Sequence, residues 1–582
     1  MSGGQSGVER ELSTLYDAYD YIVVGGGNAG CVLARRLSDN GRFTVLLVEK
    51  GDAADSWRHS TPIVSLHHFS NQKHSTVQKV YDEQLGRSIN LITGRGLGGS
   101  TRINGGQYTC GAPGEYNAWA QAGNVGWSYD DLKQYFKKSE TWIGPVSKEF
   151  HGANGPLKVR SFESYTYKSA EKMQDAAKRL GFLGISDMHS PLGPSFGYNK
   201  MQFTLDADGR RQSSFRAYLP KHLISERPVL LHVCTRAVGV KLYFSMDSSV
   251  RARADAVLVQ TLHGTRSRTI KAKREIVLAC GALATPQLLM LSGVGPASHL
   301  RETSIRPVVD LPGVGEHLQD HILVSTTYNC PLSDSFWGAI IWPPTLIREI
   351  YRYLRRGTGY LLCTLVESEI FGISSLIGED GTPLPHAKKR KDAADPKNLP
   401  DFAVLSTGIA DPQGPEVNRT KGLYGLNVAL LKPRSAGRVR LRSANPLEPP
   451  LIDTNYFSDA ADYAPLRAAL RVTLALVRSM RENGYPLRDV HVPDSSSDAS
   501  LDAFIRARAD TMMHYSSTCR MARREDARPG VVDAALRVYG VHNLRIADAS
   551  VFPDIPATHP QAAVYAVAEK CADMMLMDAG AA

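Results

Sequence analysis

Two histidines lie in short stretches whose residue types could support acid–base chemistry. The stretch "MMHYSSTCRM" contains His514, and "DIPATHPQAA", forty-five residues further along, contains His559. A neutral imidazole has a pKa of about 6.5 and can accept a proton near neutral pH, and a second imidazole can hold the oxygen that loses it. The chain has 17 histidines, so these two could also be unrelated core residues. Only the elements around them can decide whether they form a pair.

The first such element is "YDYIVVGGGNAGCVLARRLSDNGRFTVLLVEKG". Its pattern predicts a strand over 21–24, a glycine turn, a helix over 29–37 and a second strand over 44–48. Gly25, Gly27 and Gly30 fit G-x-G-x-x-G, and Glu49 stands nineteen residues beyond Gly30.

This spacing predicts a dinucleotide site. Glycines let the backbone approach a pyrophosphate, the helix N-terminus offers free N–H groups, and the distal acid accepts from ribose hydroxyls. An acid at Glu49, where a basic residue would suit a ribose phosphate, favours FAD or NAD over NADP. A purely structural glycine turn is the alternative interpretation.

A second glycine-rich stretch, "GRGLGGSTRINGGQYTCGAPGEYNAW", begins at Gly94. Glycine at this density costs backbone entropy, so we expect it mainly where a flat or phosphorylated group must be approached closely. A flexible loop is the alternative, but it does not explain the embedded Ile103-Asn104.

The gross properties exclude several classes of protein. A chain of 582 residues predicts two to four structural units. The net charge of +10 is dispersed and accompanies no nucleic-acid motif, so we expect no nucleic-acid partner. The longest basic run, 388–391, is expected to be a solvated loop.

The eight cysteines form no C-x-x-C pair, which indicates neither a zinc site nor a disulfide framework, and we expect no metal. Without a signal peptide or an apolar run of 18 residues, we expect a cytoplasmic protein with no membrane span.

The middle of the chain predicts a return to the nucleotide-binding sheet. "RPVLLHVCTRAVGVKLYF" and "ADAVLVQT" are typical of adjacent strands, and a short helix should begin at Thr285-Pro286. From about 321 to 504 an aromatic and proline-rich stretch and a polar insert precede a long amphipathic helix in "DYAPLRAALRVTLALVRSM". Long irregular inserts tend to be lids or binding loops.

Taken together, these segments resemble the glucose-methanol-choline (GMC) oxidoreductases, from about residue 19 to about 577. The likeness rests on "VVGGGNAG", "LLVEKG", "GRGLGGSTRINGG", "GALATPQLLMLSGVG", "LPGVGEHLQDH" and the terminal "GVHNLRIADASVFPDIPATHPQAAVYAVAEKCADM". It implies an α/β fold with a Rossmann-like FAD-binding domain over 15–160, 208–320 and 505–577. A discontinuous α+β substrate-binding domain would then comprise 161–207 and 321–504.

The resemblance also implies a set of FAD-binding residues. They are Gly25, Gly27, Asn28, Gly30, Glu49, Gly98, Gly99, Ser100, Asn104, Val238, Asp548, Ala549, Pro560 and Gln561. Some relatives attach the flavin through a histidine just before the asparagine, and here that position is Ile103. We therefore expect noncovalent FAD.

For the histidines, the resemblance implies that His514 is the general base in the oxidation of an alcohol or aldehyde hydrate and that His559 positions the substrate. Electrons would pass to O2 or a quinone-like acceptor. One departure is local: many relatives have Pro and then Gly after the first histidine, where this chain has Tyr515, Ser516 and Ser517. His317 and His321 are expected to be structural, and Tyr108, Glu367 and Phe402 are either pocket or packing residues.

Two alternatives remain open at this stage. The fold could serve a non-oxidative or light-driven reaction, as a lyase, cyclase or decarboxylase, because fold does not fix chemistry. It could also be a binding protein that keeps FAD structurally. Neither the substrate nor the oligomeric state follows from the sequence.

Overall fold

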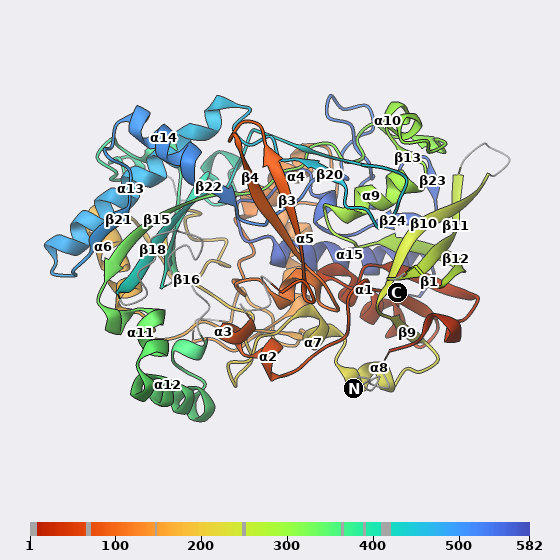
Figure 1. Cartoon of the computed structure of the whole chain (residues 1–582), viewed down its shortest axis with the longest axis horizontal. Helices are drawn as coiled ribbons and strands as arrows, with labels where there is room; N and C mark the ends of the chain where they lie inside the picture. The colour runs from red at the N-terminus through yellow and green to blue at the C-terminus, as the bar shows by residue number, and fades with distance from the viewer. Residues whose placement is uncertain are drawn as a thin grey trace.

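The structure is a computed structural model, and it describes residues 9–65, 71–145, 148–246, 252–262, 264–362, 366–387, 392–408 and 421–581. The basic run 388–391 lies outside the described residues. Two large sheets dominate the fold, one on each side of the view in Figure 1.

The first sheet is built around β1 (Ala18–Val24), whose apolar residues are buried in the core. Strand β1 pairs in parallel with β2 and β12, and an antiparallel hairpin, β10 and β11, extends the β12 side. The strand order is β10 (Ala237–Met246), β11 (Ala252–Thr261), β12 (Ser267–Leu278), β1, β2 (Val45–Val48) and β9 (Leu231–Cys234), with β23 (Val541–His542) on β11 and β24 (Leu544–Ile546) on β12.

Helix α1 (Asn28–Ser38) follows β1 directly and packs against α15 (Gln561–Asp578), which packs in turn against α5 (Tyr129–Ser139). Charge also joins α1 to α15: Arg36 Nη2 lies 2.6 Å from Asp573 Oδ1, and its Nη1 pairs with the buried Glu569. The strand, helix and strand predicted at 21–24, 29–37 and 44–48 are therefore confirmed. The C-terminal helix completes this layer.

The second sheet is mostly antiparallel, and helix α13 (Tyr463–Glu482) packs against it together with α6 (Lys168–Leu180). Its strands run in the order β21 (Arg488–His491), β15 (Ile322–Cys330), β18 (Gly422–Leu430), β17 (Phe402–Thr407), β16 (Val366–Gly372), β8 (Gly197–Lys200) and β7 (Gly184–Ile185), with β22 (Ala509–Thr511) on β15. The alternation of side chains along β16 separates its two faces. Ile370 packs with the helices, whereas Phe371 joins a second cluster that includes Ala557.

Smaller elements connect the two sheets. The two-stranded pairs are β3 (Ser75–Asp82) with β4 (Arg87–Gly94), β5 (Glu140–Trp142) with β6 (Leu157–Val159), β13 (Val294–Gly295) with β14 (Val309–Asp310), and β19 (Arg438–Arg440) with β20 (Leu451–Asp453). The remaining α-helices are α2 (Trp57–Ser60), α3 (Pro62–Ser65), α4 (Pro113–Gln121), α7 (Ser214–Tyr218), α8 (Lys221–Ser225), α9 (Ala284–Leu291), α10 (Ala297–Glu302), α11 (Phe336–Ile341), α12 (Pro343–Arg356) and α14 (Asp498–Arg508).

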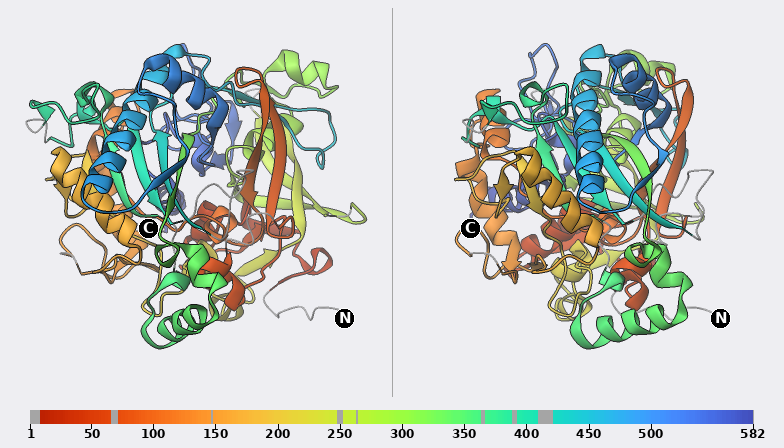
Figure 2. Two further views of the ribbon diagram at one scale, coloured as in Figure 1. Left: turned by 60° about the vertical axis from the view of Figure 1, so that its left-hand side comes forward. Right: turned by 90° about the vertical axis from the view of Figure 1, so that its left-hand side faces the viewer.

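The aromatic and proline-rich stretch is helical rather than irregular, because it forms α11 and α12. Helix α12 projects from the body in both views of Figure 2, with Ile347 and Leu354 exposed. The two sheets correspond broadly to the two expected domains, whose boundaries stay a prediction. Within the described parts of the chain, no helix combines the length and apolar character needed to cross a membrane.

Candidate functional site

The turn between β1 and α1 accepts only glycine at two of the predicted positions. Gly25 has a φ of +104°, which L side chains rarely adopt. A Cβ at Gly30 would lie 1.8 Å from the carbonyl oxygen of Gly25. The missing side chains let the first turn of α1 close onto the end of β1, which leaves the helix N-terminus open to an anionic group.

A second glycine loop lies against this turn. Gly98 donates its backbone N–H to the Gly26 carbonyl at 2.8 Å, and a Cβ at Gly99 would lie 2.8 Å from Gly27 Cα. Ser100, in the same loop, accepts from the backbone N–H of Gly94 at 3.1 Å. The two glycine-rich stretches of the sequence are therefore one structural unit, although about seventy residues separate them.

Glu49 organises this unit from the end of β2. Its carboxylate accepts backbone N–H bonds from Gly26 (2.8 Å), Gly51 (2.7 Å) and Gly96 (3.0 Å). An ionised carboxylate has about four acceptor positions, so one position is left for a hydroxyl donor. Glu49 thus holds both glycine loops and still has capacity for the predicted ribose contact.

The start of α15 meets the glycine loops through amide side chains. Asn28 Nδ2 donates to the Gln561 carbonyl at 3.2 Å, and Asn104 Nδ2 donates to Gln561 Oε1. Arg211 Nη1 donates to Asn104 Oδ1 at 2.7 Å. Asn28 Oδ1 and Gln561 Nε2 are buried and have no hydrogen-bond partner among the described residues. Because buried polar atoms are normally paired, these two atoms fit a bound polar cofactor at this junction.

The other predicted cofactor residues lie on or beside elements of the first sheet and its helices. Asp548 Oδ2 accepts from Gly281 N–H at 2.8 Å and from the Thr285 hydroxyl at 2.6 Å, which ties the segment after β24 to the turn before α9. Ala549 begins the short helix that follows, and Pro560 caps α15. Val238 lies near the start of β10, opposite Gln260. Their contacts with FAD stay a prediction.

His514 and His559 lie together, as the sequence hypothesis requires. Their ring centroids are 5.5 Å apart and the ring planes meet at 89°. A third histidine completes the group: His321 Nδ1 lies 2.9 Å from His514 Nδ1. His321 stands at the entrance to β15, and its role was not apparent from the sequence.

A buried carboxylate accompanies His559. Glu369 of β16 places Oε2 at 3.5 Å from His559 Nε2, and neither atom has a hydrogen-bond partner among the described residues. Glu369 is on the same face of β16 as Phe371, so it points away from the helices. Glu367, two residues earlier in β16, is the carboxylate that the sequence suggests as a pocket or packing residue. Its carboxylate accepts hydrogen bonds from the backbone N–H groups of Thr166 and Tyr167.

The surroundings keep the imidazoles of His514 and His321 neutral. Burial lowers the pKa of His514 well below its usual value, and the neighbouring His321 and His559 lower it further. Burial likewise lowers the pKa of His321 to about 3. A neutral imidazole can use one ring nitrogen as a donor and the other as an acceptor. Two neutral rings can therefore share the Nδ1–Nδ1 hydrogen bond.

Asp320 fixes the backbone that carries His514. Its Oδ1 accepts the His514 backbone N–H at 2.7 Å, while its Oδ2 accepts from the hydroxyls of Tyr456, at 2.6 Å, and Thr511. Burial raises the pKa of Asp320 to about 7, and the donated hydrogen bonds oppose that rise. The base and its backbone clamp thus share one desolvated region.

The Tyr-Ser-Ser departure is accommodated by side-chain hydrogen bonds. The Tyr515 hydroxyl accepts from the Ile92 backbone N–H at 3.1 Å, which links the segment to β4. Ser517 has a φ of +69° and donates from its hydroxyl to Gln319 Oε1 at 3.3 Å. A residue other than glycine is thus held in a left-handed conformation close to the histidines, which costs of order 1–2 kcal/mol.

Tyr108, Phe402 and His317 lie outside the histidine group. Tyr108 is buried with its hydroxyl 3.3 Å from Ser139 Oγ, and Phe402 is in the core of the second sheet. His317 Nε2 lies 3.1 Å from Asp554 Oδ1. Their surroundings are those of packing and structural residues.

Comparisons with known proteins find similar chains. Two family models, both described as GMC oxidoreductase, match residues 19–323 and 433–568. Oxygen-dependent choline dehydrogenase from Burkholderia lata is 34% identical over 564 residues, which cover 95% of this chain and 93% of that protein.

Solved structures share the whole fold. A variant of Aspergillus oryzae formate oxidase superposes with a TM-score of 0.83 at 26% identity, over 97% of this chain and 99% of the other. An FAD-dependent oxidoreductase from Chaetomium thermophilum gives a TM-score of 0.84 at 24% identity, over 97% and 100%. The latter likeness concerns the fold alone.

The glycine turn gives a first prediction. Gly30→Ala places a methyl group against the Gly25 carbonyl, so the turn must open; overpacking of this kind costs roughly 1–3 kcal/mol. We expect the purified variant to lose most of its flavin absorbance and to melt at a lower temperature. Gly193→Ala is the control, because a Cβ there meets nothing within 4 Å. Full FAD content and an unchanged Tm in Gly30→Ala would contradict the role given to this turn.

Proposed function

Because the chain belongs to the GMC oxidoreductase family, we propose that it oxidises an alcohol, or an aldehyde hydrate, with His514 as general base. The chain is an FAD-dependent oxidoreductase, and oxygen-dependent choline dehydrogenases are among its relatives. The observation that carries the proposal is the perpendicular contact of His514 with His559 in a desolvated site.

FAD, when bound, supplies the hydride acceptor and passes the electrons on to O2 or a quinone-like acceptor. The glycine loops and Glu49 would hold its pyrophosphate and ribose, and Asn104 with Gln561 would face the flavin end. The orphaned Asn28 Oδ1 and Gln561 Nε2 support this placement. We propose that FAD is held noncovalently, because Ile103 offers no nucleophile at the position where some relatives have a histidine.

His514 would remove the hydroxyl proton. Its Nδ1 is engaged with His321, so Nε2 is the nitrogen left for the substrate. If Nε2 is the acceptor, Nδ1 carries the hydrogen and donates it to His321 Nδ1. His321 is then the group that orients the base, in the position that a carboxylate occupies in many catalytic triads.

A neutral orienting group has a chemical consequence. A carboxylate beside an imidazole stabilises the imidazolium and so raises its pKa, whereas His321 lowers the pKa of His514. The proton that His514 accepts is therefore held weakly and is readily returned to solvent or to product. Because the imidazoles interact, they titrate as a group rather than individually.

His559 would hold the substrate oxygen. Glu369 Oε2 lies 3.5 Å from its Nε2, so the carboxylate is placed to orient the ring. A substrate hydroxyl placed between the two imidazoles would be positioned by His559 while His514 accepts its proton. Positioning of this kind raises the effective concentration of the reactive geometry.

The decisive experiment is anaerobic mixing of the FAD-loaded protein with aryl, allylic, aliphatic and sugar alcohols and with choline. We expect at least one alcohol to bleach the flavin absorbance, and air or a quinone to restore it. A compound that is turned over without any bleaching would contradict net oxidation and would favour a non-oxidative or light-driven reaction.

Removal of the base gives a second test. We expect His514→Ala to reduce the rate of flavin bleaching by about 10²–10⁴-fold, the usual contribution of general base catalysis. The variant should retain its FAD, because His514 lies outside the predicted cofactor residues. His386→Ala, at an exposed histidine, is the control and should bleach at the wild-type rate. Equal rates in the two variants would remove His514 from the mechanism.

A further inference from the structure

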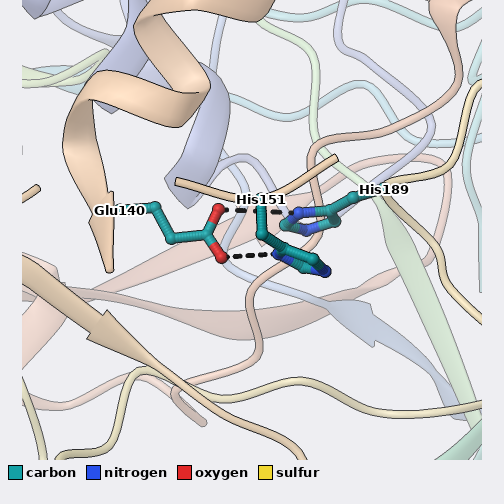
Figure 3. Close-up of side chains that lie close together, drawn as sticks. All are labelled: Glu140, His151 and His189. Atoms are coloured by element: carbon teal, nitrogen blue, oxygen red, sulfur yellow. Dashed lines mark hydrogen bonds and ion pairs between the residues drawn. The ribbon is translucent and has the colours of Figure 1, made fainter. Parts of the chain in front are cut away.

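A second group of ionisable side chains is buried outside the histidine pair, and Figure 3 shows three of its members, Glu140, His151 and His189. Glu140 begins β5, His151 follows in the loop to β6, and His189 lies in the loop after β7. Cys110 precedes α4. All four side chains are at least nine-tenths buried. A glutamate such as Glu140 is rarely fully buried unless it is paired.

The distances suit a shared cation. Glu140, His151 and His189 each offer a ligand atom, and these atoms all lie within 4.8 Å of one another. His189 Nδ1 is 3.7 Å from Glu140 Oε2 and 3.7 Å from Cys110 Sγ. Tetrahedral coordination, with bonds of about 2.0 Å to nitrogen and oxygen and about 2.3 Å to sulfur, places neighbouring ligand atoms roughly 3.3–3.6 Å apart.

Glu140 could adjust to such a cation with little movement. In the structure its Oε1 forms a 2.6 Å contact with His151 Nδ1, which is a hydrogen-bond distance. Its Oε2 faces His189, as Figure 3 shows. A cation between the two rings would therefore replace one proton and keep all the partners.

A further carboxylate, that of Asp187, contacts His151 and the backbone of His189. Asp187 Oδ1 lies 3.3 Å from His151 Nε2, on the side of the ring opposite Glu140. The same oxygen accepts the His189 backbone N–H at 2.9 Å and Gln202 Nε2 at 3.1 Å. A carboxylate on the far nitrogen of a histidine is the usual second layer of a metal site.

The two carboxylates beside the imidazoles also favour a cation. Glu140 and Asp187 each lie within 3.7 Å of a histidine nitrogen. A divalent ion would balance these two negative charges, and its entry would release the protons that its ligand atoms carry.

An entry path is present. A surface cavity of about 530 Å³ reaches both Cys110 and His189. Its rim is formed by α4 and α5, with Lys133 and Phe136 among the lining residues. A hydrated ion could therefore reach the ligands without unfolding of the protein.

We propose that Glu140, His151 and His189 form a structural site for a borderline divalent cation, with Zn²⁺ the best match, and that Cys110 supplies the fourth ligand once its Sγ, 3.7 Å from His189 Nδ1, moves toward the other ligand atoms. Zn²⁺ accepts one sulfur, two nitrogen and one oxygen ligand in a closed tetrahedral site. The sequence gives no such signal, because the ligands come from four separate segments instead of a C-x-x-C pair. The ion would anchor Cys110 next to Thr109, whose side chain bonds to Thr558, the neighbour of His559.

The test uses the full-length flavoprotein, depleted with a chelator and then titrated with Zn²⁺ alone. We expect one Zn²⁺ per chain, a higher Tm and proton release on binding, so that affinity falls as the pH is lowered. His189→Gln should weaken binding by at least tenfold. With Co²⁺ as the probe, a thiolate absorption band in the difference spectrum should be present in the wild type and lost in Cys110→Ser.

Two controls separate this site from other binding. Cys571→Ser alters a buried thiol elsewhere in the chain, and it should keep both the stoichiometry and the Co²⁺ band. FAD absorbance reports whether each variant is folded. If the wild type binds no Zn²⁺, or binds it as tightly as a folded His189→Gln variant does, the proposal is overturned and the cluster is an ion-pair network only.

Discussion

Burial of the imidazoles between the two sheets, nearly complete for His321 and His559 and partial for His514, is the constraint on which the rest of the site depends. A charged imidazole is penalised there, so burial lowers the pKa of both His514 and His321. Burial is the main reason that the base is neutral, and the neighbouring His321 and His559 add to it. Burial also makes an unpaired polar atom costly. Asp320 is accordingly held by three donors, whereas Glu369 Oε2 and His559 Nε2 have no hydrogen-bond partner among the described residues.

This desolvated region is assembled from parts that are far apart in the sequence. His514 follows an edge strand of the second sheet, whereas His559 immediately precedes the helix that covers the first. Asp320 holds the backbone of His514, and Glu369 approaches His559 from β16. The glycine loops meet the same helix through Asn28 and Gln561, so the cofactor end and the proton-handling end share one support.

Local patterns in the sequence were enough to predict the glycine turn, α1, α9 and α13, and motif context was enough to bring His514 and His559 together. His321 and Glu369 could not be found in this way. His321 lies directly before β15, and the position of Glu369 depends on the register of β16, where a shift of one residue would turn its side chain to the opposite face. Glu367 and Glu369 lie two residues apart in β16, with an irregularity between Val366 and Ser368, so the sequence pattern alone does not tell which of the two lies beside His559. The pattern of the aromatic and proline-rich stretch predicts an irregular lid or binding loop, but its residues form the helices α11 and α12.

The central claim is that desolvation keeps the catalytic base neutral. Its most direct test is the pH dependence of flavin reduction, measured anaerobically with a saturating substrate. A base with a lowered pKa stays neutral in mild acid, so the rate should be constant as the pH falls from 8 through 6.5 and decline only below that. A rate that already declines with an apparent pKa at or above about 6.5, the value of an unperturbed imidazole, would contradict the account.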